Sequence, residues 1–239
     1  FRSEEEDISN PKKQISVTLE PYYISKYELT NLEYYQFIKD GGYPDSLYWT
    51  SHGWEWKEEN NIKAPLFWNQ SDSPPYINDI HSNEDNTPVH GISFYEAESY
   101  CKWLSLKTGK NYKIPTSAQW QRAAKGPDPG GLYPWGDEMI EENFNYIYEN
   151  PDFVLLEVNT MPQGRSSDGC FHMIGNAYEY ALPIIPLYGD STKVGLYSYP
   201  DPAQSSEYFF KISMTVKSIL STKPFYRHKA KGVRICREF

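Results

Sequence analysis

The sequence predicts one compact α+β domain over residues 1–239, with few regular elements and long ordered loops. Three observations support this prediction. Apolar and polar side chains alternate near both ends of the chain, whereas helical periodicity with capping signals appears between them. Neither a shift in composition nor a linker divides the chain. Residues 43–88 show little periodicity but are rich in tryptophan, which disordered segments lack.

Composition indicates a hydrophilic chain with a core built largely from aromatic rings. The mean hydropathy is -0.70 and no run approaches the roughly 18 apolar residues of a membrane span. Aromatic residues make up 16% of the chain, so we expect internal polar networks that satisfy buried Tyr and Trp. The net charge of -9 argues against neutralising nucleic-acid phosphates. We therefore expect no nucleic-acid partner and no transmembrane segment in this chain.

The first elements are a strand pair and a short helix. Residues 14–19, QISVTL, alternate as a half-buried strand does, and residues 22–30, YYISKYELT, are expected to pair with them. Thr30 and Glu33 then fit a capping box that opens a helix over 31–40. Two glycines follow at 41–42 and end it. Residues 43–88 are expected to form a long ordered loop.

Two further helices and two strands complete the prediction. Ser93 with Glu96 opens a helix that Gly109 ends, and Thr116 with Gln119 opens another that Gly126 ends. Near the end, residues 209–216, FFKISMTV, and 232–236, GVRIC, alternate as strands. The predicted order is therefore strands, helices and again strands, which indicates an α+β fold.

Five motifs in this order resemble a known superfamily. They are PYYISKYELTNLEYYQFI at 21–38, PVHGISFYEAESYCKWLSLKTGKNYKIPTSAQWQRAAKG at 88–126, YPWGDE at 133–138, GCFHMIGNAYEY at 169–180 and GVRI at 232–235. Together they resemble the formylglycine-generating-enzyme, or sulfatase-modifying-factor, superfamily across residues 14–237. The resemblance implies a loop-rich domain with a C-type-lectin-like core that often holds calcium. It does not settle the activity, because one fold hosts many functions.

The cysteines depart from the pattern of this superfamily. Formylglycine-generating enzymes bind copper through two C-terminal thiolates, which suit the soft Cu(I) ion. Here the corresponding segment, 211–236, holds only Cys236, while Cys101 lies on an apolar helix face and Cys170 replaces a core leucine. Three cysteines without a C-x-x-C pair also argue against a disulfide framework and a zinc site. We expect three free buried cysteines, no copper and no formylglycine-generating activity.

The histidines do not match the iron-dependent relatives. Ergothioneine-type sulfoxide synthases take iron from an H-x-x-x-H-x-E helix in a separate domain, and no such spacing occurs in this chain. The five histidines are scattered, at His52, His81, His90, His172 and His228. The segment at 53–68, GWEWKEENNIKAPLFW, does resemble the loop that lines the substrate cleft of those enzymes.

Asn176 and Glu179 are the candidate metal ligands. They stand three residues apart around a turn, so both side-chain oxygens can point to one centre, as calcium requires. The resemblance implies a structural calcium site here and a second site at Asn145 with Asp152. One alternative is a buried asparagine that caps a turn, with Glu179 paired to an arginine or lysine. A catalytic carboxylate is the third and least favoured reading, and no catalytic residue is assigned.

Aromatic loops are the candidate binding surface, because recognition sites combine aromatic side chains with polar rims. The expected ligand-binding residues are Trp49, Trp54, Trp56 and Trp68, with Tyr197 and Tyr199.

The sequence therefore predicts a non-catalytic or repurposed member of the superfamily that serves as a binding or scaffolding module, stabilised by calcium. Its expected ligand is a protein, a peptide or a glycan. One alternative is a non-haem metal oxidoreductase that acts on a peptide or secondary metabolite. The other is a structural lipoprotein subunit of a bacterial envelope complex. The sequence says little about the compartment, with the periplasm or cell surface preferred.

Overall fold

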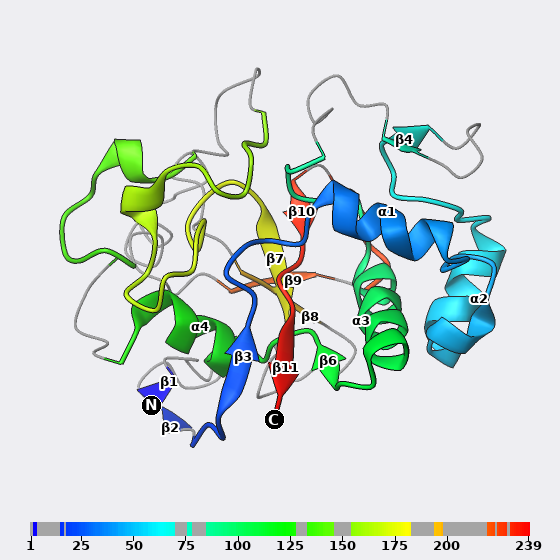
Figure 1. Cartoon of the computed structure of the whole chain (residues 1–239), viewed down its shortest axis with the longest axis horizontal. Coiled ribbons are helices and arrows are strands. Elements are labelled where there is room, and N and C mark those ends of the chain that lie inside the picture. Colours follow the sequence, from blue (N-terminus) through cyan, green and yellow to red (C-terminus); the bar gives the residue numbers. More distant parts are fainter. Residues whose placement is uncertain are drawn as a thin grey trace.

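The computed structural model describes most of the chain. It covers residues 18–69, 85–127, 133–145, 154–182, 224–228 and 230–239, with the strand backbones at 2–3, 15–16, 76–77, 194–197 and 219–222. The helices and strands gather in one α+β arrangement, with α1, α2 and α3 on one side and α4 on the other (Figure 1).

The three predicted capping boxes are confirmed. Thr30 caps α1 (Asn31–Lys39), Ser93 caps α3 (Phe94–Thr108) and Thr116 caps α4 (Ser117–Lys125), each with its reciprocal Glu or Gln bond. Gly109 ends α3 in the left-handed conformation, at φ 70°. These helix limits depend on bonds within a few residues, so the local sequence predicts them.

The segment after α1 holds more regular structure than its sequence indicates. A short 3-10 helix, η1 (Ser46–Tyr48), precedes α2 (Ser51–Glu59), where a continuous loop is expected. Thr50 caps α2 by accepting a hydrogen bond from the Gly53 amide at 3.2 Å. Only Gly53 and Lys57 of this helix are fully buried, so it carries no apolar stripe that periodicity could reveal.

The strands pair differently from the sequence prediction. β2 (Ile15–Ser16) pairs with β1 (Arg2–Ser3), whereas β3 (Tyr22–Ile24) pairs with the last strand, β11 (Cys236–Glu238). β6 (Tyr112–Lys113) lies on the other side of β11, which gives the order β3-β11-β6. The expected pairing of residues 14–19 with 22–30 is therefore wrong, because strand alternation does not identify the partner.

A second sheet lies behind the first one in Figure 1. Its order is β10-β7-β8-β9, with β10 (Lys231–Gly232) parallel to β7 (Tyr178–Ala181) and the other pairs antiparallel. β8 spans Val194–Tyr197 and β9 spans Ile219–Thr222. The predicted strand at 232–236 is thus divided between β10 and β11. The predicted strand at 209–216 lies outside the described residues.

The remaining described elements are short. A two-stranded ribbon pairs β4 (Trp68–Asn69) with β5 (Tyr76–Ile77), and two 3-10 helices, η2 (Glu141–Asn143) and η3 (Pro162–Gly164), lie in the loops that follow α4. Among the described residues, no helix is long and apolar enough to cross a bilayer.

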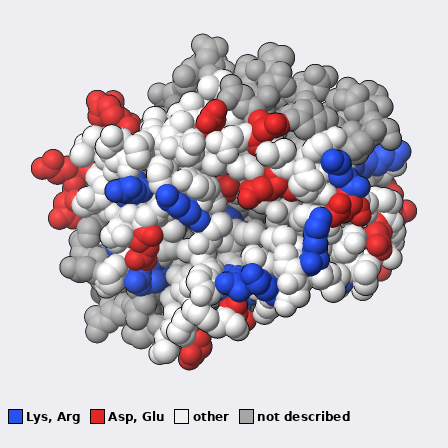
Figure 2. Space-filling view, in the orientation of Figure 1, with Lys and Arg blue, Asp and Glu red and all other residues white. Residues whose placement is uncertain are grey.

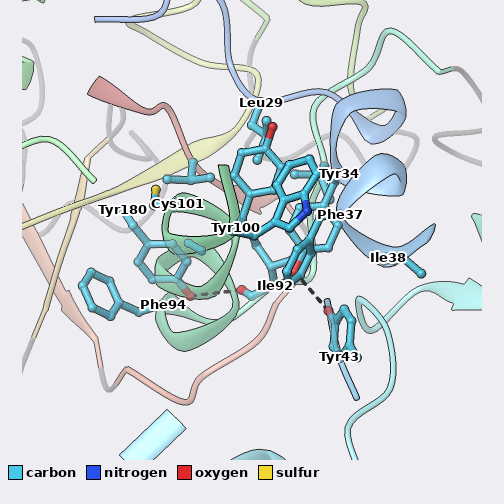
Figure 3. Close-up of a cluster of buried hydrophobic side chains, with 14 of the residues drawn as sticks. Leu29, Tyr34, Phe37, Ile38, Tyr43, Ile92, Phe94, Tyr100, Cys101 and Tyr180 are labelled. Carbon is cyan, nitrogen blue, oxygen red and sulfur yellow. Dashed lines mark hydrogen bonds between the residues drawn. The ribbon is translucent and has the colours of Figure 1, made fainter. Parts of the chain in front are cut away.

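The largest core cluster confirms the expectation of buried polar groups among rings (Figure 3). The Tyr34 ring stacks on Tyr100 with centroids 5.6 Å apart. The hydroxyls of Tyr34 and Tyr43 lie 3.1 Å apart, and Tyr43 donates to Oε1 of Glu96 at 2.6 Å. On the other side, Tyr180 donates to the Ile92 carbonyl at 3.1 Å. These bonds satisfy buried hydroxyls that would otherwise destabilise the core.

Candidate functional site

A buried ion pair lies where the two sheets meet. Arg234, between β10 and β11, is fully buried, and its Nη2 donates to Oε1 of Glu179 at 2.9 Å. Nε donates to Oε2 of the same carboxylate at 3.1 Å. The guanidinium also donates to the Ser25 carbonyl at 2.9 Å and to the Phe171 carbonyl at 2.6 Å. Trp120 of α4 donates to Glu179 Oε2 at 2.6 Å, so the carboxylate of this pair also contacts α4.

A second buried carboxyl, that of Glu28, lies beside this pair. Glu28 is 1% exposed and accepts hydrogen bonds from Nδ2 of Asn176 at 2.8 Å and from the Ala177 amide at 3.0 Å. Burial, with the negative charge of Glu179 as the next cause, raises the pKa of Glu28 from 4.5 to about 8. Arg234 and the two hydrogen bonds act in the opposite direction.

Asn176 connects Glu28 to the neighbouring loops. The residue has a left-handed backbone, at φ 57°, and is fully buried. Its Oδ1 accepts from the Leu156 amide at 2.9 Å and from Asn145 Nδ2 at 3.1 Å, and its Nδ2 also donates to the Leu156 carbonyl. Every polar atom of this side chain therefore has a protein partner.

These contacts test how well the predicted metal ligands suit calcium, which needs oxygen atoms directed at one centre. The oxygens of Asn176 and Glu179 accept hydrogen bonds from nitrogen donors, and Glu179 pairs with an arginine, as the alternative interpretation expects. A calcium ion at this pair would have to displace those donors, so the present arrangement does not fit one. Calcium binding itself stays a prediction.

The second predicted site is only partly described. Asn145 uses Nδ2 to donate to the Val154 carbonyl at 2.9 Å and to Asn176, so it belongs to the same network. Asp152 lies outside the described residues. Among those described, no group of three His, Cys, Asp or Glu side chains could hold a metal ion.

The three cysteines are free and buried, as predicted. They lie on different elements: Cys101 on α3, Cys170 in the turn that precedes Phe171, and Cys236 on β11. Burial raises the pKa of all three thiols, that of Cys236 to about 12. A thiol in this environment is neutral near pH 7.

The described histidines belong to no group of three His, Cys, Asp or Glu side chains that could hold a metal ion. His172 is buried, with Nε2 3.2 Å from the Thr160 hydroxyl, and burial together with Arg234 lowers its pKa to about 4. His90 is buried and stacks on Phe67 with ring centroids 5.1 Å apart. His52 and His228 are exposed, and His81 lies outside the described residues.

A cleft of about 380 Å³ opens along the connection between β3 and α1. Its walls are residues 25–30, Leu32 and Glu33 of α1, Asn86, residues 158–159 and Ile235. The main chain of these walls is fixed, because the Leu29 amide donates to the Val233 carbonyl and the Val158 amide donates to the Asn86 carbonyl. Acidic and basic side chains are interspersed on this face of the molecule (Figure 2). We call this cavity the central cleft.

The predicted binding tryptophans do not line the central cleft. Trp49 and Trp68 are 4% and 3% exposed and belong to the aromatic core, so their assignment to an exposed binding surface is wrong. Trp54 and Trp56 of α2 are half-buried, and Trp56 contacts Tyr95 with centroids 5.6 Å apart. Tyr199 and the side chain of Tyr197 lie outside the described residues. Ligand binding by Trp54, Trp56 and these tyrosines stays a prediction.

The sequence did not identify Glu28 and Arg234 as partners of the predicted pair. Glu28 lies in the motif YELT and Arg234 in the motif GVRI, but neither motif indicates which distant residue the charged side chain contacts. Glu28 and Asn176 are 148 residues apart in the chain, and Arg234 and Glu179 are 55 apart. Arg234 lies among apolar residues in GVRI, and this position could have indicated a buried ion pair, because a buried charge needs a partner.

Comparison with known proteins supports the resemblance. The family model of the sulfatase-modifying factor enzyme 1-like domain matches residues 1–237. A hercynine oxygenase of Mycobacterium tuberculosis is 30% identical over 190 residues, covering 76% of this chain and 42% of the relative. The mouse inactive C-alpha-formylglycine-generating enzyme 2 is 24% identical over 206 residues, covering 74% and 63%. The chain thus spans less than half the length of the hercynine oxygenase.

A solved structure shows the same fold. PvdO from Pseudomonas aeruginosa superposes with a TM-score of 0.67 at 17% identity, over 100% of this chain and 91% of that chain. At this level of identity the similarity concerns the fold alone.

Proposed function

Because this chain belongs to the sulfatase-modifying factor enzyme 1-like domain family, we propose that it is a binding module of that family. In this proposal the central cleft receives the ligand, which is a peptide, a glycan or a segment of a partner protein. The module does not carry the copper–thiolate chemistry of the formylglycine-generating enzymes.

The main support for this proposal is that all three thiols are free, buried and raised in pKa. Copper in those enzymes needs two thiolates that converge on one ion. In this chain the three cysteines are free and buried, and burial raises the pKa of every thiol, with the charge of Cys236 as the next cause at Cys101. All three cysteines of this sequence are among the described residues.

The central cleft supports the binding part of the proposal. Its walls come from distant parts of the chain but are joined by main-chain hydrogen bonds, so the shape exists before a ligand arrives. Asn86, Asn159 and Glu33 supply amide and carboxylate groups at its surface. A preformed cleft with a few polar groups is typical of recognition sites.

Binding is tested by screening the purified chain against glycan and peptide arrays. Asn159 is exposed in the cleft, so Asn159→Trp would fill the cleft and abolish binding to any hit. The matched control is Gln36→Trp on the exposed face of α1, which would leave binding unchanged. Equal binding by Asn159→Trp and the parent chain would contradict the placement of the ligand.

A metal-dependent oxidoreductase is the second candidate, and the match to hercynine oxygenases favours it. Since this chain spans under half of those proteins, the metal of such an enzyme would come from outside the matched region. Elemental analysis of the protein purified without chelator separates the candidates. Stoichiometric iron or copper supports the oxidoreductase, whereas calcium alone or no metal supports the binding module. The envelope lipoprotein role stays a prediction.

A further inference from the structure

A second cavity lies in the loops that follow α4, on the side of the molecule away from α1 and α2 (Figure 1). It measures about 690 Å³ and shares no lining residue with the central cleft. Its walls are Pro134 and Trp135 of the YPWGDE motif, Pro162 and Gln163 of η3, and residues 165–167. We call this cavity the Trp135 pocket. Its size is typical of a site for a small ligand.

Trp135 forms an aromatic wall of this pocket, and buried neighbours fix its orientation. Its ring stacks on Tyr133, with centroids 5.3 Å apart and planes at 12°, and on Phe144, at 6.0 Å and 17°. Both neighbours are buried, whereas Trp135 is half-buried and lines the pocket. Its Nε1 donates to the Glu138 carbonyl at 3.0 Å. The polar atom of the indole is therefore engaged, and the ring offers its carbon surface to a ligand.

η3 and the turn that follows it supply the polar wall. The Gly164 amide donates to the Met161 carbonyl at 2.9 Å, and the Ser166 amide donates to the Cys170 carbonyl at 2.8 Å. Oγ of Ser166 accepts from the Cys170 amide at 3.2 Å, so its hydroxyl hydrogen remains available to a ligand. Gln163 is exposed and carries both a donor and an acceptor. These main-chain bonds fix the shape of the pocket before a ligand binds.

Arg165 is the one charged residue among those that line the pocket. Its side chain is exposed, and no carboxylate in the described part of the chain pairs with it. Asp168, the acidic residue nearest to it in sequence, pairs instead with Arg122 of α4. In a chain of net charge -9, this pocket thus combines one positive charge with no lining carboxylate. A guanidinium in such a position can hold a carboxylate through two parallel hydrogen bonds.

We propose that the Trp135 pocket binds an acidic saccharide, with the sugar ring against the indole and the sugar carboxylate on Arg165. A sugar ring presents an apolar face of C–H groups, which suits the aromatic wall, and hydroxyls that suit Gln163 and Ser166. One cation matches one carboxylate, whereas a nucleotide carries phosphate charges that would need more cations. This site is independent of the ligand assigned to the central cleft.

NMR of the indole N–H groups tests the proposal in the unmodified chain. The protein has 7 tryptophans, and Trp135→Phe identifies the signal of Trp135. The probes are tri-galacturonate and 3′-sialyllactose, compared with the methyl ester of tri-galacturonate and with lactose, which lack the charge. We expect an acidic probe to shift the Trp135 signal and to bind roughly tenfold or more tightly than its neutral counterpart. The proposal is overturned if neither acidic probe shifts that signal, or if the neutral probes bind equally well.

Variants of exposed residues separate the role of the cation from folding. Arg165→Gln would weaken binding roughly tenfold or more, and Arg165→Lys would recover part of the loss. Lys110→Gln, exposed in the turn after α3, is the matched control and would leave binding unchanged. Asn159→Trp, which fills the central cleft, would also leave it unchanged, so this site and the proposed function can fail separately. Equal affinity of Arg165→Gln and the parent chain would refute the assignment of the carboxylate to Arg165.

Discussion

Replacing Arg234 with methionine keeps a flexible unbranched side chain, although a shorter one, and removes the cation of the buried pair. The change deletes four donor contacts, two to Glu179 and one each to the carbonyls of Ser25 and Phe171. Removing one partner of a buried ion pair costs about 3–5 kcal/mol. Because the two carbonyls also lose their donor, and each loss costs about 1–3 kcal/mol, we expect the upper end of that range.

The expected loss is a large share of the total stability, which is about 5–15 kcal/mol for a typical domain. For a chain of this length, 1 kcal/mol corresponds to about 2–4 °C in Tm, so Arg234→Met would lower Tm by roughly 10–20 °C. Urea denaturation followed by circular dichroism measures the same change at constant temperature.

Arg237→Met provides the matched control three residues away on β11. The Arg237 guanidinium lies 4.3 Å from the centroid of the Tyr23 ring at the surface, so its removal would cost only about 0.5–1 kcal/mol. The double variant Arg234→Met with Glu179→Met would recover much of the loss, since no unpaired charge remains at that position. If Arg234→Met costs no more than the control, the ion pair does not stabilise this fold as argued.

Three further predictions concern packing, a buried hydrogen bond and the thiols. Gly164→Ala would lower the free energy of unfolding by about 1–3 kcal/mol, because the added Cβ would lie 1.7 Å from the Asn143 carbonyl oxygen. An unchanged midpoint of urea denaturation would refute this contact. Tyr43→Phe would lower the free energy of unfolding by about 1–3 kcal/mol, because Oε1 of Glu96 would lose the hydroxyl that donates to it at 2.6 Å. An unchanged free energy of unfolding would contradict that bond. In a thiol-reagent assay the folded protein would react slowly, whereas all three cysteines of the denatured protein would react rapidly. Rapid reaction of two thiols in the folded protein would refute their burial.

Local signals in the sequence predicted the elements that depend on neighbouring residues. The capping boxes at Thr30, Ser93 and Thr116 each join residues three apart, so the local sequence is enough to indicate where these helices begin. α2 was not predicted, because its tryptophans pack on the side of the core without forming an apolar stripe. Strand partners were also not predictable, as the pairing of β3 with β11 shows.

The candidate site was predicted in part. Asn176 and Glu179 are buried and structurally important, and the arginine partner of Glu179 was one of the stated alternatives. The central cleft was not predicted, because its walls combine residues 25–33 with segments near 86, 158 and 235. The tryptophans at 49 and 68 were assigned to a binding surface, yet they fill the core. An aromatic residue suits either place, so composition cannot decide between them.

By itself, the sequence determined the family, the capped helices and the absence of a second C-terminal cysteine, since each depends on residue identity or close spacing. Only the tertiary structure decided which buried carboxylate pairs with the buried guanidinium. Arg234 holds Glu179 while Glu28 is left with neutral donors, and these contacts join residues 55 and 148 positions apart. The physical reason is that a capping bond forms within one turn of chain, whereas the environment of a buried charge exists only after distant segments have packed together.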